Sequence, residues 1–159
     1  IKKKKLSEIS KLVGADVAFG LNPKNSILNP KNEIKSFVNY KKIYTLIVKP
    51  NFGCSTKNIY SKVRKFVKPK FYQPHKNMFK FEYLQRMNNS LEPIVFFKHP
   101  ELKKVKSYLE NVLNPVFVRM TGSGSAMVAY FNSKTMCDNA KKKFNKKYKN
   151  YWCISSKTI

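Results

Sequence analysis

A short run of small residues at positions 121–125, Thr-Gly-Ser-Gly-Ser, is the feature that most constrains how this chain can fold. It lies between two apolar segments, 116–120 and 126–131, each with the length and composition of a strand. Two glycines within five residues let the backbone turn sharply between them. The pattern therefore predicts two strands joined by a glycine loop.

Hydrophobic periodicity and capping residues predict the other elements. We expect further strands at 26–28, 44–48 and 151–154, a short extended segment at 17–21, and a first helix over 7–13 that ends at Gly14. The remaining helices are expected after the N-cap Ser55, over 89–97, over 101–113 and after the N-cap Ser133. Their expected buried residues are Ile59, Val63, Phe66 and Val67; Leu102, Val105, Leu109 and Val112; and Met136, Ala140 and Phe144.

The order of these elements indicates the fold class. From residue 44 it is strand, three helices, strand, strand, helix and strand. A single antiparallel sheet with helices on one face, as in ferredoxin-like α+β folds, fits this order.

Lysine dominates the charge of the chain. Lys and Arg number 33 against 8 Asp and Glu, a net charge of +25, and only Arg64, Arg86 and Arg119 are arginine. Proteins that recognise phosphates and base edges specifically favour the guanidinium group of arginine. The chain is also rich in Asn, Ile, Phe and Tyr, which like Lys have A- and T-rich codons. A biased genome explains this composition better than a selected binding surface does. We therefore expect weak affinity for anionic ligands but no specific nucleic-acid partner. A lysine-rich RNA-binding module with a ferredoxin-like sheet stays open as an alternative.

Cysteine and histidine give no sign of a disulfide framework or a metal site. Cys54, Cys137 and Cys153 are odd in number and widely spaced, and His75 and His99 are isolated. No apolar run approaches the length needed to cross a membrane. We expect a protein without a membrane partner in a reducing compartment, the bacterial cytoplasm or a plastid-like equivalent.

Three features contain residue types that could take part in catalysis or ligand binding, and each also has a purely structural interpretation. Asp16, after Gly14, is either a catalytic carboxylate or a turn acid that bonds its own backbone. The 121–125 loop either cradles a phosphate or is an ordinary turn, and no Gly-x-x-x-x-Gly-Lys-[Ser/Thr] motif accompanies it. Tyr60 lies off the apolar face of its helix and either stacks on a nucleobase or is an exposed ring.

Five short motifs follow one another along most of the chain. They are Gly14-Ala15-Asp16-Val17; 49–53 with Ser55-Thr56 and Ile59-Tyr60; Asn89 with Leu91-Glu92-Pro93; His99-Pro100-Glu101-Leu102; and 119–125. In this order they resemble the C-terminal part of the 4-diphosphocytidyl-2-C-methyl-D-erythritol kinases. That family belongs to the superfamily of galactokinase, homoserine kinase, mevalonate kinase and phosphomevalonate kinase.

The resemblance implies a chemistry and roles for particular residues. The reaction would be ATP-dependent phosphorylation of the 2-hydroxyl of a cytidine-diphosphate methylerythritol in isoprenoid precursor synthesis, with ATP and Mg²⁺ as cofactors. Asp16 matches the family's catalytic aspartate, whose expected role is general base, or at least orienter, for the attacking hydroxyl. Tyr60 falls where the family places a ring against the cytosine, and Thr56 falls at a substrate-contacting position. Thr121, Gly122, Ser123 and Gly124 match the family's C-terminal glycine loop beside the active site.

The resemblance also implies a division of the chain. Residues 1–42 would be a remnant of the N-terminal kinase domain with the Asp16 turn, and residues 43–159 a C-terminal substrate-binding domain. The family's ATP-phosphate loop and catalytic lysine have no counterpart here, and the chain begins at Ile1 rather than Met. We therefore expect a truncated product or partial gene that is inactive alone. Ala18 and Ser90 depart from the family's Pro and Asp, and another kinase of the superfamily or a purely structural domain remains an alternative.

Overall fold

The computed structural model describes residues 3–13, 17, 20–21, 24–31, 33–38, 42–65 and 68–158. The chain forms two compact units. One comprises residues 1–41 and 68–79, and the other comprises residues 42–67 and 80–158. Among the described residues, no helix is both long enough and apolar enough to span a membrane.

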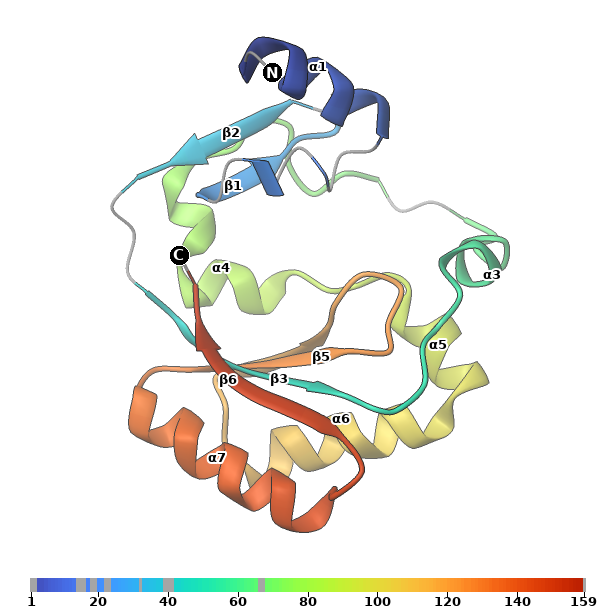
Figure 1. Cartoon of the computed structure of the whole chain (residues 1–159), viewed down its shortest axis with the longest axis vertical. Helices are drawn as coiled ribbons and strands as arrows, with labels where there is room; N and C mark the ends of the chain where they lie inside the picture. The colour runs from blue at the N-terminus through green and yellow to red at the C-terminus, as the bar shows by residue number, and fades with distance from the viewer. Residues whose placement is uncertain are drawn as a thin grey trace. The chain divides into compact units, whose positions relative to one another are not determined.

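The first unit contains one long helix and a two-stranded hairpin. Helix α1 spans Lys3–Val13, and strands β1 (Asn25–Leu28) and β2 (Ile34–Phe37) pair in antiparallel register (Figure 1). Asn29 closes the hairpin turn, since its side-chain oxygen accepts hydrogen bonds from the backbone N–H groups of Lys31 and Glu33, both at 2.9 Å. A 3₁₀ helix, Lys76–Phe79, belongs to the same unit, where the Phe79 ring contacts Phe37 edge to face at 5.6 Å.

One expectation for this unit is wrong and another is not tested. The segment 17–21 was expected to be extended, but its described residues Val17, Gly20 and Leu21 are helical. A short apolar run does not distinguish a strand from a helix, which explains the error. Gly14 and Asp16 lie outside the described residues.

The second unit is built on a four-stranded antiparallel sheet. Its strands are β3 (Tyr44–Lys49), β4 (Phe117–Met120), β5 (Met127–Phe131) and β6 (Trp152–Lys157), in the order β4-β5-β3-β6 (Figure 1). The central strand β3 pairs with β5 and with β6, so that Leu46 lies opposite both Ala129 and Ser155. This order is that of the ferredoxin-like fold and confirms the predicted class.

Two long helices cover one face of this sheet. They are α6 (Pro100–Val112) and α7 (Lys134–Lys147), and both lie on the same side of the strands (Figure 1). Ser133 caps α7 as predicted, because its hydroxyl accepts a hydrogen bond from the Met136 N–H at 3.2 Å. The shorter helices of the unit are α3 (Thr56–Tyr60), α4 (Phe81–Arg86) and α5 (Glu92–Lys98).

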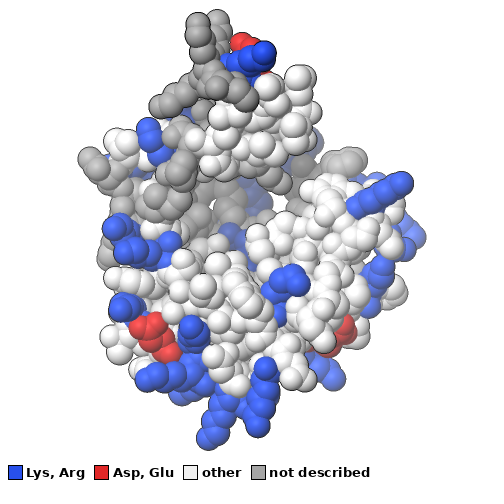
Figure 2. All heavy atoms as spheres, viewed as in Figure 1, with Lys and Arg blue, Asp and Glu red and all other residues white. Residues whose placement is uncertain are grey.

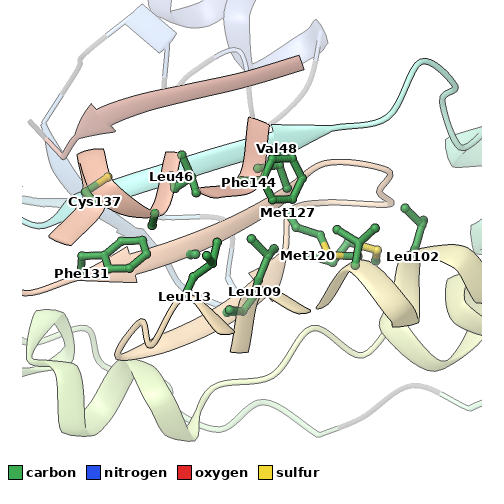
Figure 3. Close-up of a cluster of buried hydrophobic side chains, with 14 of the residues drawn as sticks. Leu46, Val48, Leu102, Leu109, Leu113, Met120, Met127, Phe131, Cys137 and Phe144 are labelled. Carbon is green, nitrogen blue, oxygen red and sulfur yellow. The ribbon is translucent and has the colours of Figure 1, made fainter. Parts of the chain in front are cut away.

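The core of the unit lies between the sheet and these two helices. Alternate residues of each central strand point into it, as period-two burial requires, and the helices contribute every third or fourth residue. Figure 3 shows the side chains of the two layers pointing toward one another. The largest fully buried side chains are Phe131, Phe144, Leu46, Ile59, Leu102, Leu109, Met120, Met127, Val48, Val95, Val105 and Cys137.

The structure corrects the expected helices in three respects. On α6, Val112 was expected to be buried with Leu102, Val105 and Leu109, but it is 48% exposed. Helix α3 ends at Tyr60, so Val63 is not on it, and Phe66 and Val67 lie outside the described residues. On α7 the buried residue of the first turn is Cys137, whereas Met136 is 39% exposed. Met136 and Cys137 are adjacent and both apolar, so the spacing of apolar residues did not decide which of the two faces the core.

Helix α4 was not predicted, and it lies on the face of the sheet opposite α6 and α7. On β4 the core-facing residues are Val118 and Met120, and the alternate residues Phe117 and Arg119 contact α4. Phe81 of α4 meets the Phe117 ring edge to face at 6.2 Å. Helices therefore cover parts of both faces of the sheet.

We predict that Leu109→Ala lowers the free energy of unfolding of this unit by about 2–5 kcal/mol, because a fully buried leucine leaves a cavity. Val112→Ala, on the same helix but 48% exposed, is the matched control and should cost no more than about 0.5 kcal/mol. Urea unfolding followed by Trp152 fluorescence measures both, since this single tryptophan lies on β6 of the same unit. Equal losses in the two variants would contradict the assigned core.

Candidate functional site

The glycine loop between β4 and β5 has a backbone that glycine makes possible. Gly122 and Gly124 have φ of +53° and +85°, in the left-handed region where a Cβ is strained. The loop is closed by hydrogen bonds from the Thr121 N–H to the Ala126 carbonyl and from the Gly124 N–H to the Thr121 carbonyl, both 3.0 Å. A Cβ at Gly124 would lie 3.0 Å from the Met120 sulfur and 3.3 Å from that of Cys54. The loop therefore packs directly against the 50–56 segment.

Asn89 holds the beginning of this loop. Its side-chain amide donates to the carbonyls of Met120 at 2.9 Å and Gly122 at 2.7 Å. Its side-chain oxygen accepts a hydrogen bond from the Leu91 N–H at 2.9 Å. One side chain thus fixes both the end of β4 and the turn that leads into α5.

The other side of the loop is bonded to the segment around α3. The buried Ser125 hydroxyl donates to the Phe52 carbonyl at 2.5 Å. The hydroxyls of Thr56 and Ser123 lie 2.9 Å apart in a hydrogen bond. Two of the predicted site residues, one from the first turn of α3 and one from the loop, are therefore in direct contact.

Glu92 connects the loop region to helix α6. One carboxylate oxygen accepts the Met120 N–H at 2.8 Å, and the other lies 2.6 Å from the Lys106 ammonium. Glu92 lies in the first turn of α5, as a helix dipole favours. These hydrogen bonds give Glu92 a structural role.

Arg119 lies half-buried on β4, behind the loop. Its guanidinium donates to the carbonyls of Leu84, at 2.6 Å, and Met87, at the C-terminal end of α4, where a cation is favoured. Burial lowers the pKa of Arg119, while Tyr130 and Glu92 oppose that shift. Burial likewise raises the pKa of Tyr130, and the charge of Arg119 opposes it. Both groups keep their usual protonation at neutral pH, so the site carries a fixed positive charge.

A pocket of about 690 Å³ opens beside these residues, within the second unit. It brings Tyr60 together with Thr121 and Gly122 of the glycine loop, while Tyr130 and Arg119 of the sheet also line it. The Tyr60 side chain is 53% exposed, as expected for a ring off the apolar face of its helix. The remaining lining residues are Val63, Arg64, Lys65, Asn88, Asn89, Ser90, Leu91, Ile94, Met120 and Val128.

The predicted site residues differ in where the structure places them. Thr56 and Ser123 lie beside the pocket, hydrogen-bonded to each other, and Gly124 faces inward against the core. Asp16 lies outside the described residues. In the part of the chain that the structure describes, no three His, Cys, Asp or Glu side chains come together as a metal site would require.

The roles of Asn89 and Arg119 were not predicted from the sequence. Both belong to the quoted motifs, but their hydrogen-bonding partners lie about thirty residues away in the chain. The sequence offered one relevant feature, the position of Asn89 at the start of the helix predicted over 89–97. That position indicates a helix cap and gives no sign of hydrogen bonds to the glycine loop.

Comparison with known proteins gives a consistent set of relatives. Residues 63–150 match the family described as GHMP kinases C terminal. A 4-diphosphocytidyl-2-C-methyl-D-erythritol kinase of Pelagibacter ubique is 49% identical over 159 residues, covering 100% of this chain and 57% of the relative. The enzyme of the same name from Petrotoga mobilis is 32% identical over 142 residues, 83% of this chain and 55% of the relative. The chain thus spans a little over half the length of these relatives.

Solved structures support the same fold. A crystal structure of a 4-(cytidine 5'-diphospho)-2C-methyl-D-erythritol kinase aligns with a TM-score of 0.72 at 24% identity, covering 97% of this chain and 57% of that one. Homoserine kinase from Cytophaga hutchinsonii aligns with a TM-score of 0.60 at 14% identity, covering 90% and 50%. At these identities the likeness establishes the fold.

We predict a graded series of glycine substitutions in the second unit. Gly53→Ala, with open space and no positive φ, should change the free energy of unfolding by no more than about 0.5 kcal/mol. Gly122→Ala should cost about 1–2 kcal/mol from backbone strain alone. Gly124→Ala adds the contacts with Met120 and Cys54 and should cost about 2–5 kcal/mol. Urea unfolding measures the three, and a Gly124→Ala variant as stable as Gly53→Ala would contradict the described loop.

Asn89→Asp should lower the free energy of unfolding by about 1–3 kcal/mol, because a carboxylate faces the two carbonyls that the amide satisfied. Asn139→Asp, at an exposed position of α7, is the matched control for the added charge. The same unfolding measurement applies. If the two variants lose equal stability, Asn89 does not hold the loop.

Proposed function

Because this chain belongs to the GHMP kinases, we propose that it forms the C-terminal, substrate-binding part of an ATP-dependent kinase. The substrate we propose is 4-diphosphocytidyl-2-C-methyl-D-erythritol, phosphorylated on its 2-hydroxyl in isoprenoid precursor synthesis. The relatives that carry this name match the chain over most or all of its length.

The observation that carries the proposal is the pocket shared by Tyr60 and the glycine loop. These residues are some sixty positions apart in the sequence, and the fold brings them to one cavity whose size suits a small ligand. The Thr56–Ser123 hydrogen bond joins the same two segments beside it. An exposed aromatic ring next to a small-residue loop supports binding of a nucleobase and an attached phosphate.

We assign the reaction roles as follows. Tyr60 stacks on the cytosine and Thr56 contacts the substrate, while Thr121, Gly122, Ser123 and Gly124 shape the wall beside the reacting groups. Asp16 is the general base, or orienter, for the attacking hydroxyl. Transfer of a phosphoryl group depends mainly on positioning and charge stabilisation, so a rigid loop serves it directly.

The complete protein would supply the rest of the catalytic site. The described residues offer no cluster of metal ligands, so we assign no Mg²⁺ ligands to them. ATP and its metal would be held by the N-terminal half that the relatives possess beyond this chain. In this proposal residues 1–42 belong to that N-terminal domain and residues 43–159 form the substrate-binding domain.

We predict that Asp16→Asn in the complete protein lowers kcat by at least about 10²-fold, the scale of a lost general base. The assay measures phosphorylation of the cytidine-diphosphate alcohol with ATP and Mg²⁺. Asp138→Asn, on α7, is the matched control and should leave the rate unchanged.

Two results would overturn the proposed function. One is a complete protein that fails to phosphorylate this alcohol under those conditions. The other is an unaffected Asp16→Asn variant combined with binding of generic RNA that weakens steeply with salt, which would favour an RNA-binding module.

A further inference from the structure

Two cationic side chains on the wall of the pocket, Arg64 and Lys65, have no assigned role in the proposed reaction. We infer that they form an anion subsite that binds the diphosphate group of the substrate. This inference rests on the proposed function for the identity of the nucleoside, whereas the anionic character of the ligand follows from the pocket itself.

The chain places these cations next to Tyr60. Helix α3 ends at Tyr60, and the following turn is closed by the Val63 N–H, which donates to the Tyr60 carbonyl at 3.0 Å. Arg64 and Lys65 come directly after this turn and line the same cavity as the Tyr60 ring. A ligand whose base stacks on Tyr60 therefore has its next group within the reach of two long basic side chains.

The charged residues around the pocket leave Arg64 and Lys65 available to bind an anionic ligand. None of the described lining residues is acidic, and neither Arg64 nor Lys65 forms an ion pair with a described residue. Glu92, whose charge acts on Arg119, is paired with Lys106 of α6. Arg119 donates to backbone carbonyls, so its charge adds to the positive potential of the cavity.

The pocket suits a small phosphorylated ligand. Guanidinium and ammonium groups bind phosphate oxygens through charge-assisted hydrogen bonds, and the nearby side chains of Asn88, Ser90 and Thr121 are polar. A diphosphate that joins two alcohols carries one negative charge on each phosphate, which two cations can match. On the face that Figure 2 shows, basic side chains lie at several separate places on the surface.

The test uses isothermal titration of the 159-residue chain with cytidine diphosphate, cytidine and inorganic diphosphate. The variant Arg64→Gln/Lys65→Gln should bind cytidine diphosphate about 10- to 100-fold more weakly and should bind cytidine unchanged. Lys62→Gln removes a neighbouring exposed charge that does not line the pocket, and it should leave all three affinities within about twofold. Tyr60→Ala should weaken cytidine and cytidine diphosphate together.

The outcomes separate this inference from the proposed function. If Arg64→Gln/Lys65→Gln weakens cytidine diphosphate no more than Lys62→Gln does, or if the unsubstituted chain binds neither diphosphate, the subsite is refuted. If both diphosphates bind through Arg64 and Lys65 while the complete protein does not phosphorylate the cytidine-diphosphate alcohol, the subsite stands and the proposed function fails. Circular dichroism of each variant establishes that the fold is retained.

Discussion

The absence of a side chain at Gly124 is the constraint on which the site depends. A Cβ at this position would lie within contact distance of Met120 on β4, Cys54 before α3 and Val95 on α5. Three segments that are distant in the sequence can meet there only because no Cβ separates them. The hydrogen bonds from Asn89 and Ser125 then hold the backbone of the loop in this close-packed conformation.

The positive charge of the pocket follows from the small number of acidic residues in the chain and from the partners that Glu92 has. Glu92 accepts a hydrogen bond from the Met120 N–H and is paired with Lys106, whose positive charge offsets that of the carboxylate. The guanidinium of Arg119 donates hydrogen bonds to the carbonyls at the end of α4. The result is a positively charged wall that includes the exposed side chains of Arg64 and Lys65, an arrangement that favours anions.

Local patterns predicted the sheet and the long helices, because strands β3, β4 and β5 and helices α6 and α7 each have clear periodicity, and Ser133 gives a sharp helix start. Helix α4 was missed because its N-cap, Lys80, makes no side-chain capping bond and follows a basic loop. Helix α3 was predicted too long because Val63 continues an apolar spacing that the structure uses to line a pocket instead. The roles predicted for Tyr60, Thr56 and the glycine loop came from the resemblance to a known family. The role of Asn89 was missed because it depends on tertiary hydrogen bonds, which no local sequence pattern specifies.

The pairing of β3 with β6 has a consequence for how the protein is made. β3 is the central strand of the sheet, yet the residues that it pairs with on β6 lie roughly a hundred positions later in the chain, a high contact order. During synthesis one edge of β3 therefore stays unpaired until β6 has left the ribosome, and an open strand edge of this kind recruits other chains. The speed at which this sheet closes sets how long the nascent protein is exposed to aggregation.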